Sequence, residues 1–390
     1  MPAKKSPSRN SLRQKESPAQ RVLDWYRHNR RDLPWRARLG KTVDPYHVLL
    51  SEFMLQQTVV ATVIPYFNRF LARWGTLADF AKAPRSEVMG AWAGLGYYAR
   101  ARNLHQTAQI VMAEYGGQLP RDEKVLRTLP GIGEYTAAAI RAFAFGEKAV
   151  VLDANGERII ARYAGIATPL PHGKGEIKAT LAQLTPDVHA GDFAQGLMDL
   201  GQTICLARQP PLCRACPLAD DCQAYLSGDP SSLPKKLVKK ERPRRHGHVL
   251  VVVSADKHVL LLRRGDKGLL GGMHVFPTSG WADGSPKRVR YPPEKDSILA
   301  GLIADFASDP HYVIQKQPVR HVFTHFALEL KVAYVGEVKR GTLKKLVAQA
   351  GGVWVPIAQL DRGDGIALPT AMRKVAVAVG LLSGERHVAQ

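Results

Sequence analysis

The sequence predicts a two-domain protein: an all-α domain that carries a metal-binding loop, followed by an α+β or mostly β domain. Three observations lead to this fold class. The chain has 390 residues, more than one ordinary hydrophobic core accommodates. Helical periodicity runs from residue 20 to about residue 226, and short β-rich runs follow residue 246. All four cysteines lie within residues 205–222.

The chain divides into four predicted segments. Residues 1–19 have the composition of a disordered basic tail, and the helical domain is expected over residues 20–226. Proline, glycine and basic residues indicate a linker at 227–246, and the second domain is expected over 247–380. Helical runs punctuated by Pro or Gly are predicted at Val48–Phe70, Arg85–Trp92, Ala99–Glu114, Thr136–Phe145 and Glu157–Ala164.

The second domain is predicted from short runs of β-branched and aromatic residues. His248–Val253 and His258–Arg263 are joined by three residues, which indicates a β-hairpin. Further strands are expected at Val319–Phe323, Ala327–Val335 and Gly352–Val355. These strands and the intervening segments predict an α+β or mostly β domain.

Charge points to a polyanionic partner. The chain has 55 Lys and Arg against 34 Asp and Glu, a net charge of +21, which favours nucleic acid first and an acidic membrane surface second. No run of about twenty apolar residues predicts a membrane span. Residues 1–17 are polar and lack the apolar core of a signal peptide, so we expect a reducing cytosol.

The cysteines Cys205, Cys213, Cys216 and Cys222 form a candidate metal site. In a reducing compartment, such a cluster is expected to bind metal rather than to form disulfides, and thiolates are soft ligands. Structural zinc sites pair two short ligand hairpins, whereas here Cys213 and Cys216 alone are so closely spaced. The spacing therefore favours an iron–sulfur cluster, with zinc as the alternative.

The string Leu129-Pro-Gly131-Ile-Gly133 lies between two helical runs. A Gly-x-Gly turn points backbone N–H groups outward at the start of a helix, where a phosphate can dock. A helix C-cap is the alternative interpretation. Beside the positive charge and the cysteines, the string becomes a candidate helix-hairpin-helix that grips a DNA backbone.

These motifs, in this order, resemble the endonuclease III helix-hairpin-helix superfamily of DNA glycosylases. Leu50–Thr58, Gly94–Arg100, Arg102–Leu104 and the string Leu152-Asp153-x-Asn155 resemble its adenine DNA glycosylase (MutY-type) branch. The resemblance is strong over residues 20–225 and weaker over 246–375. It implies a monofunctional enzyme of base excision repair that removes adenine mispaired with 8-oxoguanine or guanine in double-stranded DNA. It also implies a [4Fe–4S] cluster, although the seven residues between Cys205 and Cys213 exceed the family's usual six.

Breaking an N-glycosidic bond requires a proton for the leaving base and a negative group beside the cationic sugar, as in glycoside hydrolysis. Glu52 is the candidate acid, because its mostly apolar helical neighbours are expected to raise its pKa; a core carboxylate with a partner is the alternative. Asp153 is a predicted helix N-cap that the helix dipole keeps ionised, which suits a sugar stabiliser. Asn155 matches a family position that supports the same site.

Tyr135 distinguishes two subclasses. By resemblance, bifunctional relatives have at this position a lysine that forms a Schiff base, which a phenol cannot do. We therefore expect no true strand-cleaving lyase activity.

The target adenine must leave the duplex stack. By resemblance, Leu55, Gln57 and Tyr98 lie near the lesion and act as wedges, and Trp35 and Arg36 line the adenine pocket. Ordinary core packing is the alternative for Leu55 and Trp35.

The second domain resembles a Nudix-like fold through Gly268-Leu-Leu270 and His274–Pro277, without the acidic run that holds the metal of a Nudix hydrolase. The string Phe323-Thr324-His325 matches a Phe-Ser-His loop that, by resemblance, reads 8-oxoguanine. Without the resemblance, it is a polar pair at a strand end.

Other functions remain open: a bifunctional pyrimidine-lesion glycosylase, a thymine-mismatch glycosylase, and a non-catalytic, lesion-sensing DNA-binding protein. Tyr135 disfavours the first and the second domain disfavours the second. We expect a monomer that acts in the cytoplasm, associated with the nucleoid if the source is bacterial.

Overall fold

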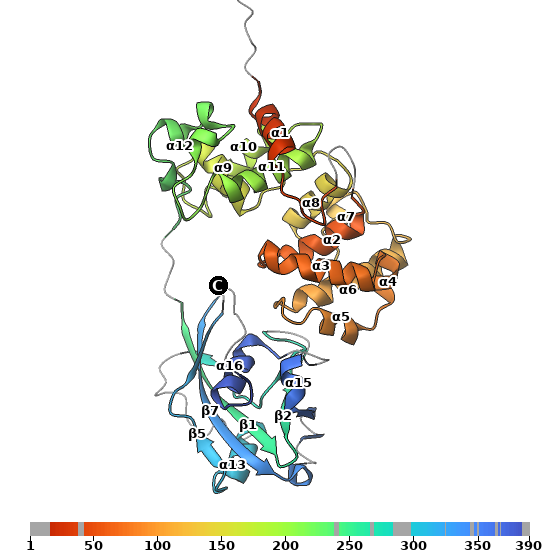
Figure 1. The fold of residues 1–390 in the computed structure, drawn as a ribbon, viewed down its shortest axis with the longest axis vertical. Coiled ribbons are helices and arrows are strands. Elements are labelled where there is room, and N and C mark those ends of the chain that lie inside the picture. Colours follow the sequence, from red (N-terminus) through yellow and green to blue (C-terminus); the bar gives the residue numbers. More distant parts are fainter. Residues whose placement is uncertain are drawn as a thin grey trace, which may run out of the picture. The chain divides into compact units, whose positions relative to one another are not determined.

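The computed structural model describes residues 16–37, 43–237, 242–265, 269–283, 298–323, 325–343, 347–348, 351–362, 366 and 368–383. The chain forms two compact units (Figure 1). The first combines Met1–Ala78 with Thr107–Val238, and the second combines Asp79–Gln106 with Lys239–Gln390.

The first unit is helical. Its described helices are α1 (Pro18–Asn29), α2 (Pro45–Leu55), α3 (Val60–Arg73), α4 (Leu77–Lys82), α6 (Ala99–Glu114), α7 (Glu123–Leu126), α8 (Glu134–Ala144), α9 (Ala154–Tyr163), α10 (Lys174–Leu184), α11 (Ala190–Thr203) and α12 (Gln223–Leu226). Helices α4 and α6 each lie partly in the second unit. Three short 3₁₀ turns, Cys213–Ala215, Ala219–Asp221 and Pro230–Ser232, lie in the same unit.

Helix starts follow ordinary capping chemistry. The Asp44 side chain accepts a hydrogen bond of 2.8 Å from the backbone N–H of Tyr46, and Pro45 occupies the first helical position of α2. Ser17 caps α1 in the same way. The helix predicted over Ala99–Glu114 is confirmed as α6.

One predicted helix was wrong. The run Val48–Phe70 is two helices, because α2 ends at Leu55 and α3 begins at Val60. Gln57 adopts a left-handed backbone with φ of 57°, which no α-helix contains. The apolar periodicity continues on both sides of this turn, and therefore hides it in the sequence.

Close helix packing determines the centre of this unit. Helix α8 is rich in alanine and packs against α2 and α11. A Cβ atom on Gly191 of α11 would lie 2.5 Å from the Ala142 carbonyl oxygen, so only glycine permits this approach. The core between α1, α9, α10 and α11 contains, among others, Val22, Ile159, Ile177 and Leu200.

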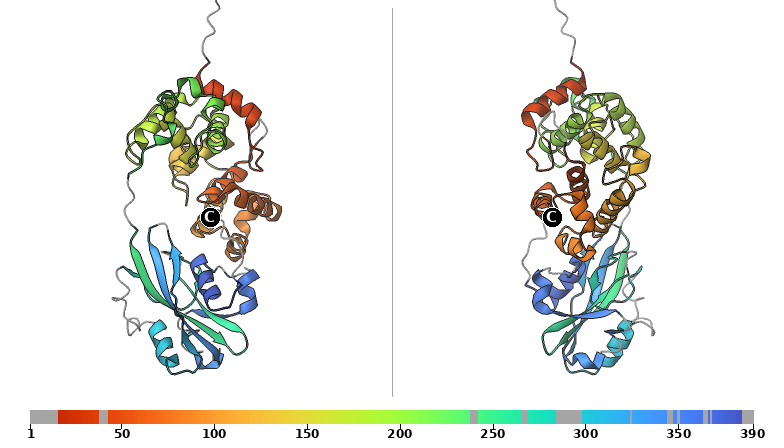
Figure 2. Two further views of the ribbon diagram at one scale, coloured as in Figure 1. Left: turned by 60° about the vertical axis from the view of Figure 1, so that its left-hand side comes forward. Right: turned by 90° about the vertical axis from the view of Figure 1, so that its right-hand side faces the viewer.

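The second unit contains a mixed sheet, as Figure 2 shows in two views. Its described strands are β1 (Arg244–Ser254), β2 (His258–Arg263), β3 (His274–Val275), β4 (Ala282–Asp283), β5 (Tyr312–Ile314), β6 (Val319–Val322), β7 (Ala327–Val338) and β8 (Gly352–Pro356). The order is β3-β2-β1-β7-β5; in addition, β4 pairs with β1, β6 with β7 and β8 with β2. Strands β1 and β7 are parallel, and the β1–β2 hairpin is antiparallel as predicted.

Strand β1 is buried on both faces, which explains its continuous apolar run. Val249 and Val251 face a core completed by Met372 and Val375 of α16 (Thr370–Ala378). Leu250 faces the core completed by α13 (Ile298–Phe306). Helices α5 (Arg85–Ala91) and α15 (Ile357–Arg362) also belong to this unit, as does a 3₁₀ turn at Arg340–Leu343. The expected α+β architecture is confirmed.

None of the helices in the described residues is both long and apolar enough to cross a membrane.

Candidate active site

One large pocket lies in the helical unit. Its volume is about 690 Å³, and its walls come from the segment after α1, from α2 and its following turn, from the start of α8, from the α9 N-terminus and from α11. It contains several of the residues proposed from the sequence: Trp35, Arg36, Glu52, Leu55, Gln57, Tyr135, Asp153 and Asn155. The fold thus brings together side chains that are as far as 120 positions apart in the chain.

Glu52 lies in the buried part of α2, and the residue is 6% exposed. The Tyr135 hydroxyl hydrogen-bonds its carboxyl group. Burial raises the pKa of Glu52 to about 7; Asp153 raises it further, whereas the Tyr135 hydrogen bond and Arg36 oppose this. At pH 7 Glu52 is therefore protonated in about half of the molecules, far more than an ordinary carboxyl group.

Asp153 caps the N-terminus of α9, as predicted. Its two carboxyl oxygens accept hydrogen bonds of 2.7 Å from the Gly156 N–H and from the Asn155 side-chain amide. The N-cap position alone predicts a lowered pKa. Burial at the pocket wall instead raises the pKa of Asp153, and the hydrogen bonds from Gly156 and Asn155 oppose that rise.

Asn155 connects Asp153 to the end of α11. Its side-chain oxygen accepts hydrogen bonds from Arg158 Nη2 (2.9 Å) and Gln202 Nε2 (3.1 Å). Arg158 also donates from Nη2 to the Gly201 carbonyl (2.6 Å) and from Nε to the Cys205 carbonyl (2.7 Å). The orientation of Asn155, and through it that of Asp153, therefore depends on α11 and on the backbone at the first cysteine.

Tyr135 is the second residue of α8 and donates to Glu52. Burial raises the pKa of Tyr135 well above its ordinary value, and the charges of Glu52 and Asp153 add to the effect. The phenol therefore stays protonated and acts as a hydrogen-bond donor to Glu52.

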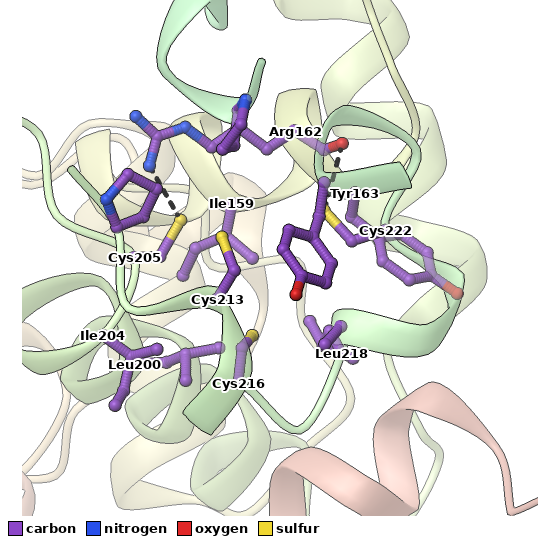
Figure 3. Close-up of a pocket in the computed structure, with 14 residues that line it drawn as sticks. Ile159, Arg162, Tyr163, Leu200, Ile204, Cys205, Cys213, Cys216, Leu218 and Cys222 are labelled. Atoms are coloured by element: carbon purple, nitrogen blue, oxygen red, sulfur yellow. Dashed lines mark hydrogen bonds between the residues drawn. The ribbon is translucent and has the colours of Figure 1, made fainter. Parts of the chain in front are cut away.

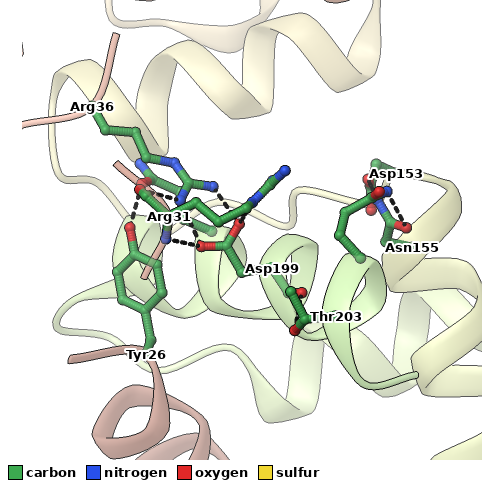
Figure 4. Close-up of polar contacts among 9 residues, drawn as sticks. Tyr26, Arg31, Arg36, Asp153, Asn155, Asp199 and Thr203 are labelled. Atoms are coloured by element: carbon green, nitrogen blue, oxygen red, sulfur yellow. Dashed lines mark hydrogen bonds and ion pairs between the residues drawn. The ribbon is translucent and has the colours of Figure 1, made fainter. Parts of the chain in front are cut away.

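Sequence reasoning missed the residue that anchors the pocket arginines. Asp199 of α11 is fully buried, and Arg36 contacts it with Nη1 at 2.6 Å and Nη2 at 2.9 Å. Arg31 adds Nε at 2.5 Å and its backbone N–H at 3.0 Å, as Figure 4 shows. The signal was a single acidic residue, Asp199, within the apolar run Leu197–Leu200.

The remaining pocket residues of the sequence prediction lie at its wall. Trp35 is 8% exposed and packs edge-on against Phe67, with ring centroids 5.4 Å apart. Leu55 is the last residue of α2, and Gln57 lies in the turn that follows. Tyr98 belongs to the other unit, where it is buried.

The predicted hairpin separates α7 from α8. Leu129 is buried, and Gly131 has a φ of 79°, a conformation that favours glycine. Gly133 is the N-cap residue of α8. The Thr107 hydroxyl donates a hydrogen bond of 2.8 Å to the Pro130 carbonyl and fixes the turn. The turn therefore stands at a helix N-terminus, as phosphate docking requires.

All four cysteines line a second pocket in the same unit (Figure 3). Arg162 Nη1 donates to the Cys205 sulfur at 3.1 Å. Burial, with repulsion from the neighbouring cysteines, raises the pKa of Cys216 to about 12, against a hydrogen bond from the Leu218 backbone. Residues 207–210 of the longer first gap are exposed, so the extra residue is accommodated at the surface. Across the described ranges, no three His, Cys, Asp or Glu side chains are grouped to hold one metal ion.

In the second unit, Phe323 and His325 follow β6; Thr324 lies outside the described residues, as does Gly268. His325 is exposed, and the Phe323 N–H donates to the Phe326 carbonyl at 2.8 Å. The Phe323 ring stacks on Trp281 with centroids 5.7 Å apart and planes at 30°. Trp281 was not predicted from the sequence, because its segment carries no motif.

The position of Trp281 depends on a glycine. A Cβ atom on Gly247 of β1 would lie 2.7 Å from Trp281 Cδ1. Gly247→Ala should therefore displace Trp281 and lower the free energy of unfolding of this unit by about 1–3 kcal/mol. Thermal unfolding followed by tryptophan fluorescence measures this. Gly280→Ala is the control, because nothing lies within 4 Å of its added Cβ; equal melting curves for the two variants would refute the packing argument.

A hairpin before α8 and two carboxyl groups in one pocket are the features of a helix-hairpin-helix DNA glycosylase. The family model described as "HhH-GPD superfamily base excision DNA repair protein" matches residues 50–187, and a NUDIX domain model matches residues 248–378. These matches define a base excision repair enzyme with an appended Nudix-like domain.

Curated relatives identify the family. The human adenine DNA glycosylase is 32% identical over 406 aligned residues, covering 91% of this chain and 72% of that protein. The adenine DNA glycosylase of Mycolicibacterium smegmatis is 42% identical over 219 residues, covering 56% of this chain and 73% of that protein. The match to the solved structure of a thermostable thymine-DNA glycosylase covers 54% of this chain and 95% of that chain, at 34% identity and a TM-score of 0.49. The chain belongs to the adenine DNA glycosylase family.

Proposed function

We propose that this enzyme hydrolyses the N-glycosidic bond of adenine mispaired with 8-oxoguanine or guanine, as a monofunctional glycosylase. The observation that carries the proposal is that Glu52 and Asp153 line one pocket. The proposed reaction needs one of these carboxyl groups protonated and the other ionised. Glu52 is partly protonated at neutral pH, and Asp153 accepts hydrogen bonds on both oxygens. This pair matches the acid and the charge stabiliser that glycosidic cleavage needs.

In the proposed reaction, Glu52 donates its proton to the adenine ring as the bond to the sugar breaks. Protonation turns the base into a neutral leaving group, and general acid catalysis of this kind contributes about 10²–10⁴-fold in rate. Tyr135 supports the step, because its hydroxyl hydrogen-bonds and orients the Glu52 carboxyl group, while its own raised pKa keeps the phenol neutral.

Asp153 stabilises the positive charge that develops on the deoxyribose. Its hydrogen bonds from Gly156 and Asn155 hold the carboxylate in one orientation. Water then attacks the sugar carbon and gives its proton to the Glu52 carboxylate, which leaves an abasic site and restores the acid. Because the chain has Tyr135 where a Schiff-base lysine would stand, the DNA strand remains intact. We also propose that the enzyme acts as a monomer on duplex DNA.

We further propose that the four-cysteine loop holds a [4Fe–4S] cluster. Four soft thiol donors face one pocket, and Arg162 at the Cys205 sulfur balances negative charge there. When bound, the cluster would supply a rigid cross-link of the loop and no chemistry in base removal. The carbonyl of Cys205 accepts from Arg158, so loop order is coupled to Asn155.

Cys216→Ser should remove one cluster ligand. Purified protein is expected to lose the broad absorption near about 400 nm that iron–sulfur proteins show, together with iron content and thermal stability. Iron and sulfide analysis of the wild-type protein, purified anaerobically, is the parallel measurement. A colourless wild-type preparation with one zinc per chain would overturn the assignment.

For the second unit, we propose that the turn at Phe323 and His325 reads the base opposite the adenine. Exposed His325 offers a ring that donates or accepts, and the Phe323 ring is held by Trp281. The single experiment that tests the whole function is a single-turnover excision assay on four duplexes, containing A:8-oxoguanine, A:G, A:T or T:G.

Adenine release is expected from the first two duplexes and fastest from A:8-oxoguanine. Borohydride added during turnover should trap almost no covalent protein–DNA adduct. Release of thymine from T:G would favour a thymine-mismatch glycosylase, and tight binding without release from any duplex would favour a lesion-sensing protein. Efficient trapping would contradict the monofunctional chemistry.

A further inference from the structure

Asp199 lies behind the pocket wall rather than in it. Its carboxylate is fully buried and receives four hydrogen bonds, two from Arg36 and two from Arg31. The Arg36 side chain is 4% exposed, and its guanidinium lies 5.7 Å from the ring centroid of buried Tyr26. Both arginines line the pocket that contains Glu52.

The charges around Glu52 determine what Asp199 does. The titratable and charged side chains that face this pocket are Tyr135, Asp153, Glu157, Arg31, Arg36 and Lys174. Lys174 is paired with Glu157 at 2.9 Å, so that pair is internally balanced. The two arginines together carry +2 at the wall of the pocket that contains Glu52, and Arg36 lowers the pKa of Glu52. Positive charge favours the ionised form of a carboxyl group.

Asp199 offsets half of that charge. Burial by itself would raise its pKa, but the ion pairs with Arg36 and Arg31 outweigh burial and hold the pKa below its usual range. The carboxylate is therefore anionic throughout the neutral range. The Asp199 carboxylate also accepts two parallel hydrogen bonds from Arg36, which hold the Arg36 guanidinium against Asp199.

We propose that Asp199 is a positioning residue for the glycosylase reaction: it restrains and neutralises Arg36 and Arg31 so that Glu52 remains protonated. The proposal rests on the proposed role of Glu52 as the acid. A role confined to folding would lower activity equally at every pH. A role through Glu52 instead moves the pH at which activity is lost.

The first test is the pH profile of single-turnover adenine excision by Asp199→Asn. The substitution keeps the side-chain shape and removes the negative charge. The alkaline fall in rate should move to lower pH by on the order of one unit. Relative to wild type, the variant would lose about tenfold at pH 8 and less than about twofold at pH 5.5 through this effect, since the rate follows the protonated fraction of the acid.

The second test should shift the alkaline fall in rate in the opposite direction. Arg31 is the more exposed arginine, with 29% of its side chain accessible. Arg31→Gln removes one positive charge and should move the alkaline fall to higher pH. The double variant R31Q/D199N restores the net charge, and its pH profile should return towards that of wild type. A structural defect would make the double variant no better than D199N.

Asp192→Asn is the matched control, because Asp192 lies in the first turn of the same helix and contacts His189, not the pocket arginines. Its profile should match wild type. Circular dichroism checks that every variant is folded. A D199N profile with an unmoved alkaline limb, at any activity level, overturns the proposal. If Glu52→Gln stays fully active, the acid assignment fails instead, and the two failures are distinguishable.

Discussion

Glu52→Gln should reduce adenine excision by about 10²–10⁴-fold, the contribution typical of a general acid. The amide keeps the size and the hydrogen-bonding capacity of the carboxyl group but has no proton to donate to adenine. Binding to the mispaired duplex should remain within about threefold, because the pocket shape is unchanged. Single-turnover excision and equilibrium DNA binding, measured on the same preparation, check both parts.

The same substitution has a predictable effect on stability. The pKa of Glu52 is about 7 in the folded protein against 4.5 ordinarily, so ionising it opposes folding. This penalty is absent below pH 4.5, grows between pH 4.5 and 7, and amounts to about 3 kcal/mol above that range. Glu52→Gln should therefore raise the melting temperature at pH 8 and leave it nearly unchanged at pH 4.5. An equal shift at both pH values would show that Glu52 is not desolvated.

Gly201→Ala should lower excision by about 10²-fold although residue 201 does not line the pocket. A Cβ atom there would lie 2.5 Å from Asn155 Cβ and 2.9 Å from its side-chain oxygen. Asn155 must then move, and Asp153 loses the 2.7 Å hydrogen bond that orients it. The free energy of unfolding should fall by about 1–3 kcal/mol. Excision kinetics and chemical denaturation measure the two effects.

Gly175→Ala provides the matched control. It places a methyl group on α10 of the same unit, with nothing within 4 Å, and alanine stabilises a helix by about 1 kcal/mol relative to glycine. Its activity should equal that of wild type. The expectation for Gly201→Ala would be contradicted by wild-type kinetics in a variant whose folding is intact.

Several elements could be predicted from the sequence because the information is local. Helix α6 follows from apolar spacing, the Asp153 N-cap from a short polar residue before a helix, and the hairpin strands from short β-rich runs. The break at Gln57 could not be predicted in this way. Its left-handed backbone interrupts the helix, whereas the apolar pattern on both sides favours one continuous helix.

The candidate site shows the same division. Glu52 was proposed from its apolar neighbours on one helix, and burial does raise its pKa. Asp199 was not proposed, because its role depends on hydrogen bonds from Arg31 and Arg36, which are more than 160 positions away in the chain. Trp281 was missed for a similar reason, since the space for its ring depends on Gly247 of β1, which is distant in the chain. No periodicity in the sequence encodes such long-range contacts.

The sequence by itself determined the enzyme family, the helical and α+β architecture, the four thiol donors and the carboxyl groups suited to glycosidic cleavage, because motif chemistry and periodicity are properties of neighbouring residues. Only the tertiary structure decided the direction of the Asp153 pKa shift and the charges that surround Glu52. Burial raises the pKa of Asp153 despite its helix N-cap, and Asp199 holds the pocket arginines. Desolvation and charge balance depend on everything within a few ångströms, and folding alone brings those groups together.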